Sequence, residues 1–169
     1  MVAQLTLRQA HIAESARLGM VAFDSWQNSL MTYFPDGKLA REKMKTELVL
    51  YVIGALERLT VAEKDGEVAG WIAREANYVP YLWVAPTKQR EGIGSSLLFQ
   101  IEADMVAAGH RRSILDTVAA HEAAIRFYER AGYEIVQRGQ SVTRTGRMSV
   151  EKVRLVKQLT VAMSREAQN

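Results

Sequence analysis

The residues that point most clearly to a specific chemistry are those at positions 89–94, Q-R-E-G-I-G. They follow an apolar run, Y-L-W-V-A-P at 81–86, and open a segment in which apolar residues recur at helical spacing. A strand that passes through a glycine-bearing turn into a helix directs free backbone N–H groups and the positive end of the helix dipole toward one point. Glycines there let the backbone approach a ligand closely. The segment therefore predicts a pyrophosphate site.

Two nucleotide-binding motifs that share this geometry are excluded by the residues that follow. A P-loop requires a lysine after its second glycine, and no lysine follows Gly94. A dinucleotide fingerprint requires a third glycine where this chain has Leu97. What remains is Q-x-x-G-x-G behind a strand that ends in Val-Ala-Pro. This pattern resembles the acyl-CoA turn of the GNAT N-acetyltransferase superfamily.

A second segment carries the other signature of that superfamily. Residues 123–133, A-A-I-R-F-Y-E-R-A-G-Y, are similar to its A-x-x-F/L-Y-E-x-x-G-F/Y motif, and they follow Leu115-Asp116-Thr117. Both motifs occur in the family's order and at its separation. The chain is therefore identified as a GNAT member. This implies acetyl-CoA as acetyl donor and a primary amine, on a small molecule or a protein N-terminus, as acceptor by direct attack in a ternary complex.

The resemblance also implies which residues bind the cofactor. In the family the fourth strand splays from the fifth, and acyl-CoA inserts its pantetheine between them like an additional strand. Backbone groups of Leu82, Trp83 and Val84 would pair with pantetheine and polarise the thioester carbonyl. The residues implied in the pyrophosphate turn are Gln89, Arg90, Glu91, Gly92, Ile93, Gly94 and Ser95.

Tyr128 falls on the tyrosine of the second motif, which implies that it contacts the cofactor and protonates the CoA thiolate. A phenol with a pKa of about 10 is protonated at neutral pH. Outside the family, a tyrosine on an apolar helical face is usually a core residue. His121 stands where the family commonly has an asparagine that contacts the cofactor. A histidine there can donate to a pantetheine or phosphate oxygen, relay a proton, or simply begin the helix.

The general base is the least defined part of the predicted site. Many family members carry a glutamate on the fourth strand, yet Tyr78–Val84 contains no acidic residue. Asp116 is the best substitute, because its separation from Tyr128 resembles the Glu-to-Tyr spacing of the family's ribosomal-protein alanine acetyltransferases. Glu75 and Asp24 are alternatives, and an acceptor amine of low pKa would need no base. The chain has no cysteine, so an acyl-cysteine intermediate is excluded.

Aromatic side chains are frequent in the segments that line the acceptor pocket in this family, which are the first two helices, their link and the strand ends. They would bind an apolar or cationic group by packing and cation–π contact. We expect Trp26, Tyr33 and Tyr81 to be the more exposed and to contact the substrate. Phe23 and Trp83 could instead belong to the core.

Two other functions stay open. The missing fourth-strand glutamate and the histidine at position 121 favour a non-catalytic acyl-CoA-binding or regulatory domain, whereas the intact Tyr128 argues against it. The other is an acyltransferase that uses a longer acyl-CoA. The bulky Trp83 beside the acyl site disfavours this use.

The elements that must position these residues follow the family's order. Periodicity predicts a short strand around Leu5 and two helices, the first with Ile12 on its apolar face. A hairpin of two strands follows, with Leu59–Lys64 as its first strand and Asp65-Gly66 as its turn. Next come the strand Tyr78–Val84, a helix at 92–108, a strand at 113–118, a helix at 122–131 and two long C-terminal strands joined by a turn at 144–146. We expect an α/β (α+β) GNAT fold with a mixed central sheet of six to seven strands, splayed between strands 4 and 5 and flanked by about four helices. Residues 1–163 would form a single domain, and residues 164–169 a frayed tail.

Composition sets the remaining expectations. Nearly half the 169 residues are apolar and about a quarter are charged, which is typical of a soluble globular protein. No apolar run suits a membrane span and the start lacks a signal-peptide pattern, so we expect a cytoplasmic enzyme without a membrane partner. The three histidines lack metal-ligand spacing. The basic excess in residues 109–169 suits an anionic cofactor and lacks the pattern typical of nucleic-acid binding. A homodimer through the C-terminal strands stays open.

Overall fold

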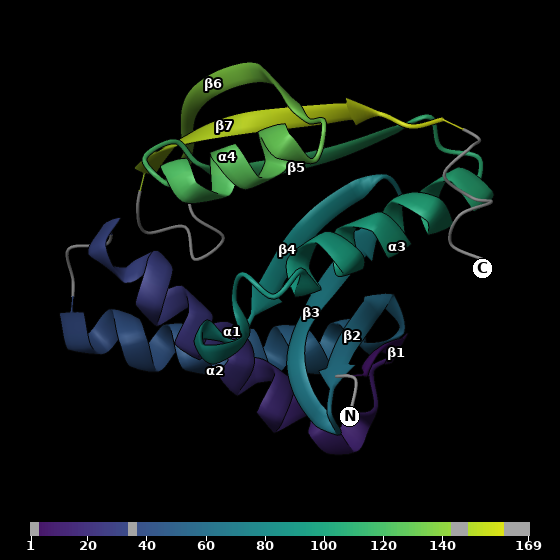
Figure 1. Cartoon of the computed structure of the whole chain (residues 1–169). Helices are drawn as coiled ribbons and strands as arrows, with labels where there is room; N and C mark the ends of the chain where they lie inside the picture. Colours follow the sequence, from purple (N-terminus) through teal and green to yellow (C-terminus); the bar gives the residue numbers. More distant parts are fainter. Residues whose placement is uncertain (1–3, 34–36, 143–148, 161–169) are drawn as a thin grey trace. The chain divides into compact units, whose positions relative to one another are not determined.

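The computed structural model describes residues 4–33, 37–142 and 149–160. Figure 1 shows the helices and strands along this part of the chain. They are β1 (Leu5–Gln9), α1 (Ser15–Ser29), α2 (Gly37–Ala55), β2 (Leu59–Lys64), β3 (Glu67–Glu75), β4 (Tyr78–Val84), α3 (Ile93–Ala107), β5 (Arg112–Val118), α4 (Glu122–Arg130), β6 (Glu134–Val142) and β7 (Ser149–Gln158). No helix in these ranges is both long enough and apolar enough to cross a membrane.

The strands form a mixed sheet in the order β1-β2-β3-β4-β5-β7-β6. β4 and β5 are parallel and pair at Tyr78–Ile114 and Val79–Leu115. In contrast, β5 pairs with β7 along its whole length, from Arg112–Gln158 to Val118–Lys152. The predicted element order and the mixed sheet with its four α-helices are confirmed.

Local sequence determines several boundaries closely. β2 and β4 have the predicted limits. Asp65 and Gly66 join β2 to β3 with φ angles of 53° and 81°, the conformation that a two-residue hairpin turn favours. The first helix is an exception, because Ile12, predicted on its apolar face, lies in a preceding 3₁₀ turn and is 64% exposed. The predicted C-terminal turn at 144–146 and the tail at 164–169 lie outside the described residues.

The chain forms two compact units. The first comprises the described residues of Met1–Arg74 and Tyr81–Ile101, and the second those of Glu75–Pro80 and Glu102–Asn169. The expectation of one domain spanning residues 1–163 stays a prediction.

In the first unit, buried residues of α1 and α2 pack with those of β2, β3 and β4. Trp71 on β3 is fully buried, and its indole N–H donates to the carbonyl of Leu18 on α1 at 2.8 Å. Gly70, beside it, faces β4 so closely that a Cβ would lie 2.5 Å from the carbonyl oxygen of Trp83. This glycine therefore permits the approach of β3 to the strand that carries predicted cofactor-binding residues.

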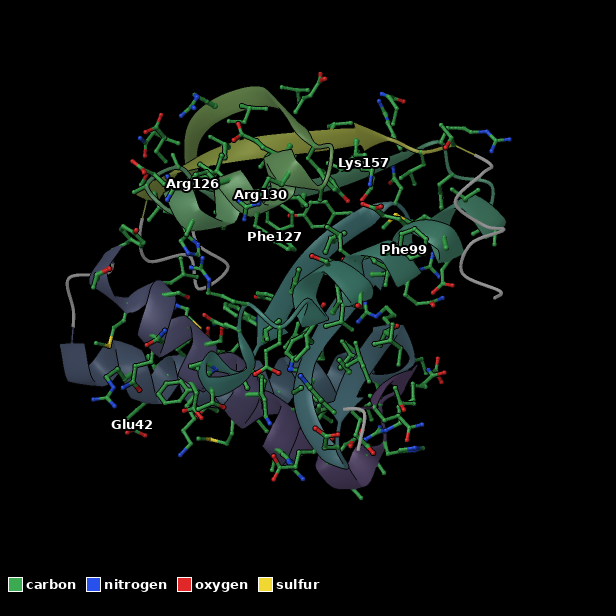
Figure 2. The ribbon with its side chains drawn as sticks, viewed as in Figure 1. Glu42, Phe99, Arg126, Phe127, Arg130 and Lys157 are labelled. Carbon is green, nitrogen blue, oxygen red and sulfur yellow. The ribbon has the colours of Figure 1, made fainter. Side chains whose placement is uncertain are left out.

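In the second unit, α4 covers one face of β5, β7 and β6 (Figure 1). The Tyr133 hydroxyl donates to Ser113 Oγ at 2.7 Å, joining the segment between α4 and β6 to β5. Glu102, only 1% exposed, accepts a 2.6 Å hydrogen bond from Lys157, which extends from β7 (Figure 2). A buried carboxylate needs such a partner, since an unpaired buried charge strongly destabilises a fold.

Two helical glycines of the first unit predict opposite effects of the same substitution. A Cβ on Gly19 in α1 would overlap the Val49 side chain and lie 3.0 Å from Val49 Cα, whereas a Cβ on Gly54 in α2 would meet nothing within 4 Å. Gly19→Ala should lower the free energy of unfolding by about 1–3 kcal/mol through overpacking. Gly54→Ala should raise it by about 0.5–1 kcal/mol through helix propensity. Urea unfolding of both variants checks this, and a Gly19→Ala protein as stable as the parent contradicts it.

Candidate active site

The turn between β4 and α3 has the conformation needed to present backbone donors. Arg90 has a φ of 67° and Gly92 a φ of 79°, so the chain reverses through two left-handed residues before the helix begins. The first helical hydrogen bond runs from the Ser96 N–H to the Gly92 carbonyl, at 3.0 Å. The preceding N–H groups, those of Ile93, Gly94 and Ser95, have no intrahelical acceptor. They are available to an anion at the helix N-terminus.

Three side chains of the turn contact other parts of the protein. Gln89 donates from Nε2 to the Val84 carbonyl at 3.2 Å, which ties the turn to the end of β4. Glu91 forms an ion pair with Lys64 at the end of β2. Ile93 is buried in the core. Of the predicted turn residues, these three therefore hold the turn in place through their side chains, and the backbone N–H groups of the turn stay available to a ligand.

Leu82, Trp83 and Val84 lie at the end of β4, beyond the residues that pair with β5. Trp83 is 8% exposed and belongs to the core of the first unit, where Tyr81 stacks on it at 5.8 Å between ring centroids. This confirms the core alternative for Trp83, and Phe23 is likewise a core residue. The Trp83 indole N–H is buried without a hydrogen-bond partner among the described residues.

The aromatic residues predicted to contact the acceptor are not equally accessible. Trp26 is 3% exposed and stacks against Phe23 in the core, so the expectation that it is exposed is wrong. It lies on the same face of α1 as Leu18 and Ala22, and this face packs inward. Tyr33 and Tyr81 are half-buried. They alone of the three keep accessible surface in this unit.

Tyr128 lies on α4 in the second unit, directly after Phe127, which Figure 2 labels. Its ring contacts those of Phe127 and Tyr133, with centroids 5.0 and 5.7 Å apart. In the described part of the chain, its hydroxyl has no hydrogen-bond partner. Burial raises the pKa of Tyr128 above its ordinary value, and Tyr78 adds to this shift. The phenol is thus protonated at neutral pH and can donate to a ligand.

His121 precedes α4 as its N-terminal cap residue. Its carbonyl accepts hydrogen bonds from the N–H groups of Ala124 and Ile125 at 3.1 and 3.2 Å. Burial lowers the pKa of the half-buried imidazole below its ordinary value, so the ring is neutral at pH 7. His121 thus brings polar groups to the start of α4 without a positive charge.

Asp116 on β5 is held by two partners that the sequence analysis did not identify. Arg154 on β7 binds it with two hydrogen bonds, Nε to Oδ1 at 2.8 Å and Nη2 to Oδ2 at 2.9 Å. The Tyr78 hydroxyl on β4 donates to Oδ2 at 3.2 Å. Arg154 is the main cause of a lowered Asp116 pKa, with burial opposing it. Asp116 and Arg154 face each other in the β5–β7 register, so only that register could have revealed the pair.

The other two candidate bases differ in their exposure to solvent. Asp24 is exposed on α1, and Glu75 is partly buried at the end of β3.

The sequence profile of the acetyltransferase (GNAT) family matches residues 23–133, a range that includes both the turn and Tyr128. The chain belongs to the acetyltransferase (GNAT) family. Members of this family use acetyl-CoA. The peptidyl-lysine N-acetyltransferase YiaC of Escherichia coli is 31% identical over 77 residues, which are 45% of this chain and 49% of that protein. The match thus spans about half the length of this curated relative.

Solved structures share the GNAT fold at lower identity. A GCN5-related N-acetyltransferase from Rhodopseudomonas palustris has a TM-score of 0.74 at 18% identity, covering 94% of this chain and 99% of that chain. The PaiA N-acetyltransferase from Thermoplasma acidophilum, in complex with coenzyme A, has a TM-score of 0.73 at 17% identity, covering 92% and 99%. The ribosomal-protein-S18-alanine N-acetyltransferase from E. coli has a TM-score of 0.67 at 16% identity, covering 93% and 95%. These similarities confirm the fold.

The turn generates a direct test of cofactor binding. Gly94→Val places a branched side chain at the start of α3, among the free N–H groups, and should weaken acetyl-CoA binding at least tenfold by steric exclusion. Gly54→Val is the matched control, because a Cβ at Gly54 meets nothing within 4 Å. Titration calorimetry with acetyl-CoA on both variants gives the measurement. Equal affinity in the Gly94→Val protein and the parent would remove the turn from the binding site.

Proposed function

We propose that this protein is an N-acetyltransferase that moves the acetyl group of acetyl-CoA to a primary amine by direct attack in a ternary complex. The acceptor is a small molecule or a protein N-terminus, and the similarity to a peptidyl-lysine acetyltransferase adds the lysine side chain of a peptide. The observation that carries the proposal is the Tyr128 hydroxyl, which has no partner among the described residues and stands on the helix of the family's second motif.

The donor set of the turn fits the diphosphate of acetyl-CoA. The free N–H groups of Ile93, Gly94 and Ser95 stand at a helix N-terminus, where anions bind favourably. Gly92 has open space at the place of a Cβ, so its backbone can come close to an oxygen. Leu82, Trp83 and Val84 would pair with the pantetheine through their backbone, and His121 would add a polar contact. A neutral His121 can donate or accept a hydrogen bond there.

Acetyl-CoA supplies an acetyl group activated as a thioester. In this proposal Tyr128 donates a hydrogen bond to the sulfur as negative charge develops on it. Because burial raises the pKa of Tyr128, its proton is harder to give up completely than that of a free phenol. Tyr128 therefore acts mainly as a hydrogen-bond donor to the thiolate. The proton that finally neutralises the thiolate is the one that the attacking amine releases.

Asp116 is better suited to hold other groups than to accept a proton. Its carboxylate is bound twice by Arg154 and once by Tyr78, and a lowered pKa makes it a weaker base than an ordinary aspartate. We therefore assign Asp116 a positioning role in place of the base predicted from its spacing. The ammonium form of the acceptor then loses its proton to water and not to a side chain.

The proposal is tested by thiol release from acetyl-CoA in the presence of a panel of small amines, peptides with free N-termini and lysine peptides. Amine-dependent thiol release with at least one acceptor supports it. The alternative is a non-catalytic acyl-CoA-binding domain. Tight acetyl-CoA binding without amine-dependent thiol release across the panel would establish that alternative.

Replacement of the Tyr128 hydroxyl separates its chemical role from a packing role. Tyr128→Phe keeps the ring contacts with Phe127 and Tyr133, and should lower turnover by about 10²–10⁴-fold with acetyl-CoA affinity little changed. Tyr133→Phe is the matched control, because it removes a buried hydroxyl that bonds Ser113. It should lower the free energy of unfolding by about 1–3 kcal/mol and leave turnover nearly intact. Near-parental turnover of Tyr128→Phe where chemistry limits the rate would assign Tyr128 to the core.

The pH dependence of Asp116→Asn distinguishes a base from a positioning group. The substitution keeps the size of the side chain and removes its charge. With a positioning role, kcat/KM falls at all pH values and its profile stays parallel to that of the parent. With a base, the loss is largest at low pH, where neutral amine is scarce, and activity recovers as the pH approaches the amine's own pKa. Measurement of kcat/KM against pH on the best acceptor decides between them, and a steeper profile in the variant would restore the base.

A further inference from the structure

A polar hollow lies on the sheet of the second unit. It has a volume of about 200 Å³ and is lined by Asp116, Gln137, Gly139, Gln140, Ser141, Lys152 and Arg154. These residues come from β5, β6 and β7.

The strand registers place the hollow on the face opposite α4. Asp116, Arg154 and Gln137 form one row across the three strands, and Lys152 and Gly139 belong to the next row on the same face. Residues such as Ser113, which bonds Tyr133 in the segment after α4, alternate with them and point to the other face. The hollow is thus separate from the packed side of the sheet.

Gly139 is what keeps the hollow open beside Lys152. The two residues face each other in the β6–β7 register, and a Cβ on Gly139 would meet nothing within 4 Å. Any larger residue at position 139 would place its side chain in this space. A small ligand can occupy it instead.

The charged groups of the hollow leave positive charge for a ligand. Arg154 is paired with Asp116 through Nε and Nη2, and this pair is nearly neutral. Lys152 is half-buried and close enough to Asp116 to help lower the pKa of that carboxylate, and it makes no hydrogen bond or ion pair with a described residue. Three charged side chains with a net charge of +1 suit a monoanion, such as a carboxylate, better than a doubly charged phosphate.

The hollow is connected to the proposed reaction centre by Tyr78. Its hydroxyl donates to Asp116 at the edge of the hollow, and its proximity to Tyr128 contributes to the raised pKa of that phenol. Tyr78 therefore lies within electrostatic range of both groups.

We propose that the hollow binds the acceptor and that Lys152 selects an amine that also carries a carboxylate, as amino acids do. Lys152 donates to the carboxylate, with Gln137 and the free Nη1 of Arg154 as further donors. The side chain of the acceptor occupies the space beside Gly139. This inference rests on the proposed function only in placing an acceptor here, and carboxylate binding can be measured without catalysis.

The binding test uses N-acetylated amino acids, the products of such a reaction, and their carboxamides as neutral counterparts. Titration calorimetry should detect the carboxylates with the parent protein, and Lys152→Gln should weaken their binding about tenfold or more, as expected for loss of a charge-assisted hydrogen bond. Carboxamide binding should not change. Arg138→Gln removes one positive charge from β6 on the opposite face, and serves as the control for net charge. Equal binding of carboxylates and carboxamides by the parent overturns the proposal.

The kinetic test compares amino acids with their amides as acceptors in both proteins. Lys152→Gln should reduce the ratio of kcat/KM for acid over amide about tenfold and leave KM for acetyl-CoA unchanged. The acid-to-amide ratio in the variant is divided by the same ratio in the parent. The different amine pKa values of acid and amide affect both proteins equally and cancel. Gly139→Val, which fills the hollow and keeps its charge, should weaken both acceptors together. An unchanged ratio in Lys152→Gln overturns the proposal.

The binding test and the kinetic test distinguish a failure of the proposed function from a failure of the carboxylate site. Lys152-dependent carboxylate binding by a protein that acetylates nothing would reject the proposed function and keep the hollow as a carboxylate site. Acetylation of amines without a preference for a carboxylate would keep the proposed function and reject the hollow as a carboxylate site. A phosphoethanolamine and ethanolamine pair distinguishes the other anion, and a Lys152-dependent preference for the phosphate alone would replace the carboxylate assignment.

Discussion

The bidentate pair between Asp116 and Arg154 organises the polar face of the second unit. It joins β5 to β7 at facing positions in their register and adds a hydrogen bond from Tyr78 on β4. Three strands are thereby linked through one carboxylate. Because the Asp116 pKa is lowered by folding, the pair stabilises the folded state above the ordinary aspartate pKa, and this contribution is lost as pH falls through the lowered value. The pair therefore persists over the whole range in which an amine acetyltransferase would act.

Neutral side chains, charged side chains and backbone donors occupy different parts of the candidate site. Tyr128 keeps a protonated hydroxyl without a partner in the described chain, and His121 is neutral, so these two side chains offer hydrogen bonds without charge. The hollow on the sheet of this unit is instead lined by three charged side chains, those of Asp116, Arg154 and Lys152. In the first unit, donors come from the backbone of a turn in which the Gln89 and Glu91 side chains bind other parts of the protein. The first GNAT motif thus acts here mainly through the backbone conformation of the turn.

Features that depend on local sequence were predictable, and those that depend on distant pairing were not. The limits of β2 and β4, the Asp65-Gly66 turn and the strand–turn–helix order around Gly92 follow from patterns a few residues long. The burial of Trp26 depends on which face of α1 meets α2 and the sheet. The residue type alone does not tell which face that is, because a tryptophan can be part of a core or of a binding surface. Arg154 and Lys152 are 38 and 36 residues from Asp116 in the chain, and only the β5–β7 register brings them beside it. The most local motif was accordingly the most informative, whereas the acceptor side of the site needed the structure.

The ion pair between Lys64 and Glu91 has a consequence for how related sequences can diverge. Glu91 places a negative charge within the turn that would receive a diphosphate, and Lys64 at the end of β2 offsets it. A lineage that loses the lysine would leave that charge to repel the ligand, whereas a lineage that loses the glutamate no longer needs a cation at position 64. The two positions, 27 residues apart, should therefore vary together among relatives. Coupled substitution here would record a charge balance that neither position reveals when considered alone.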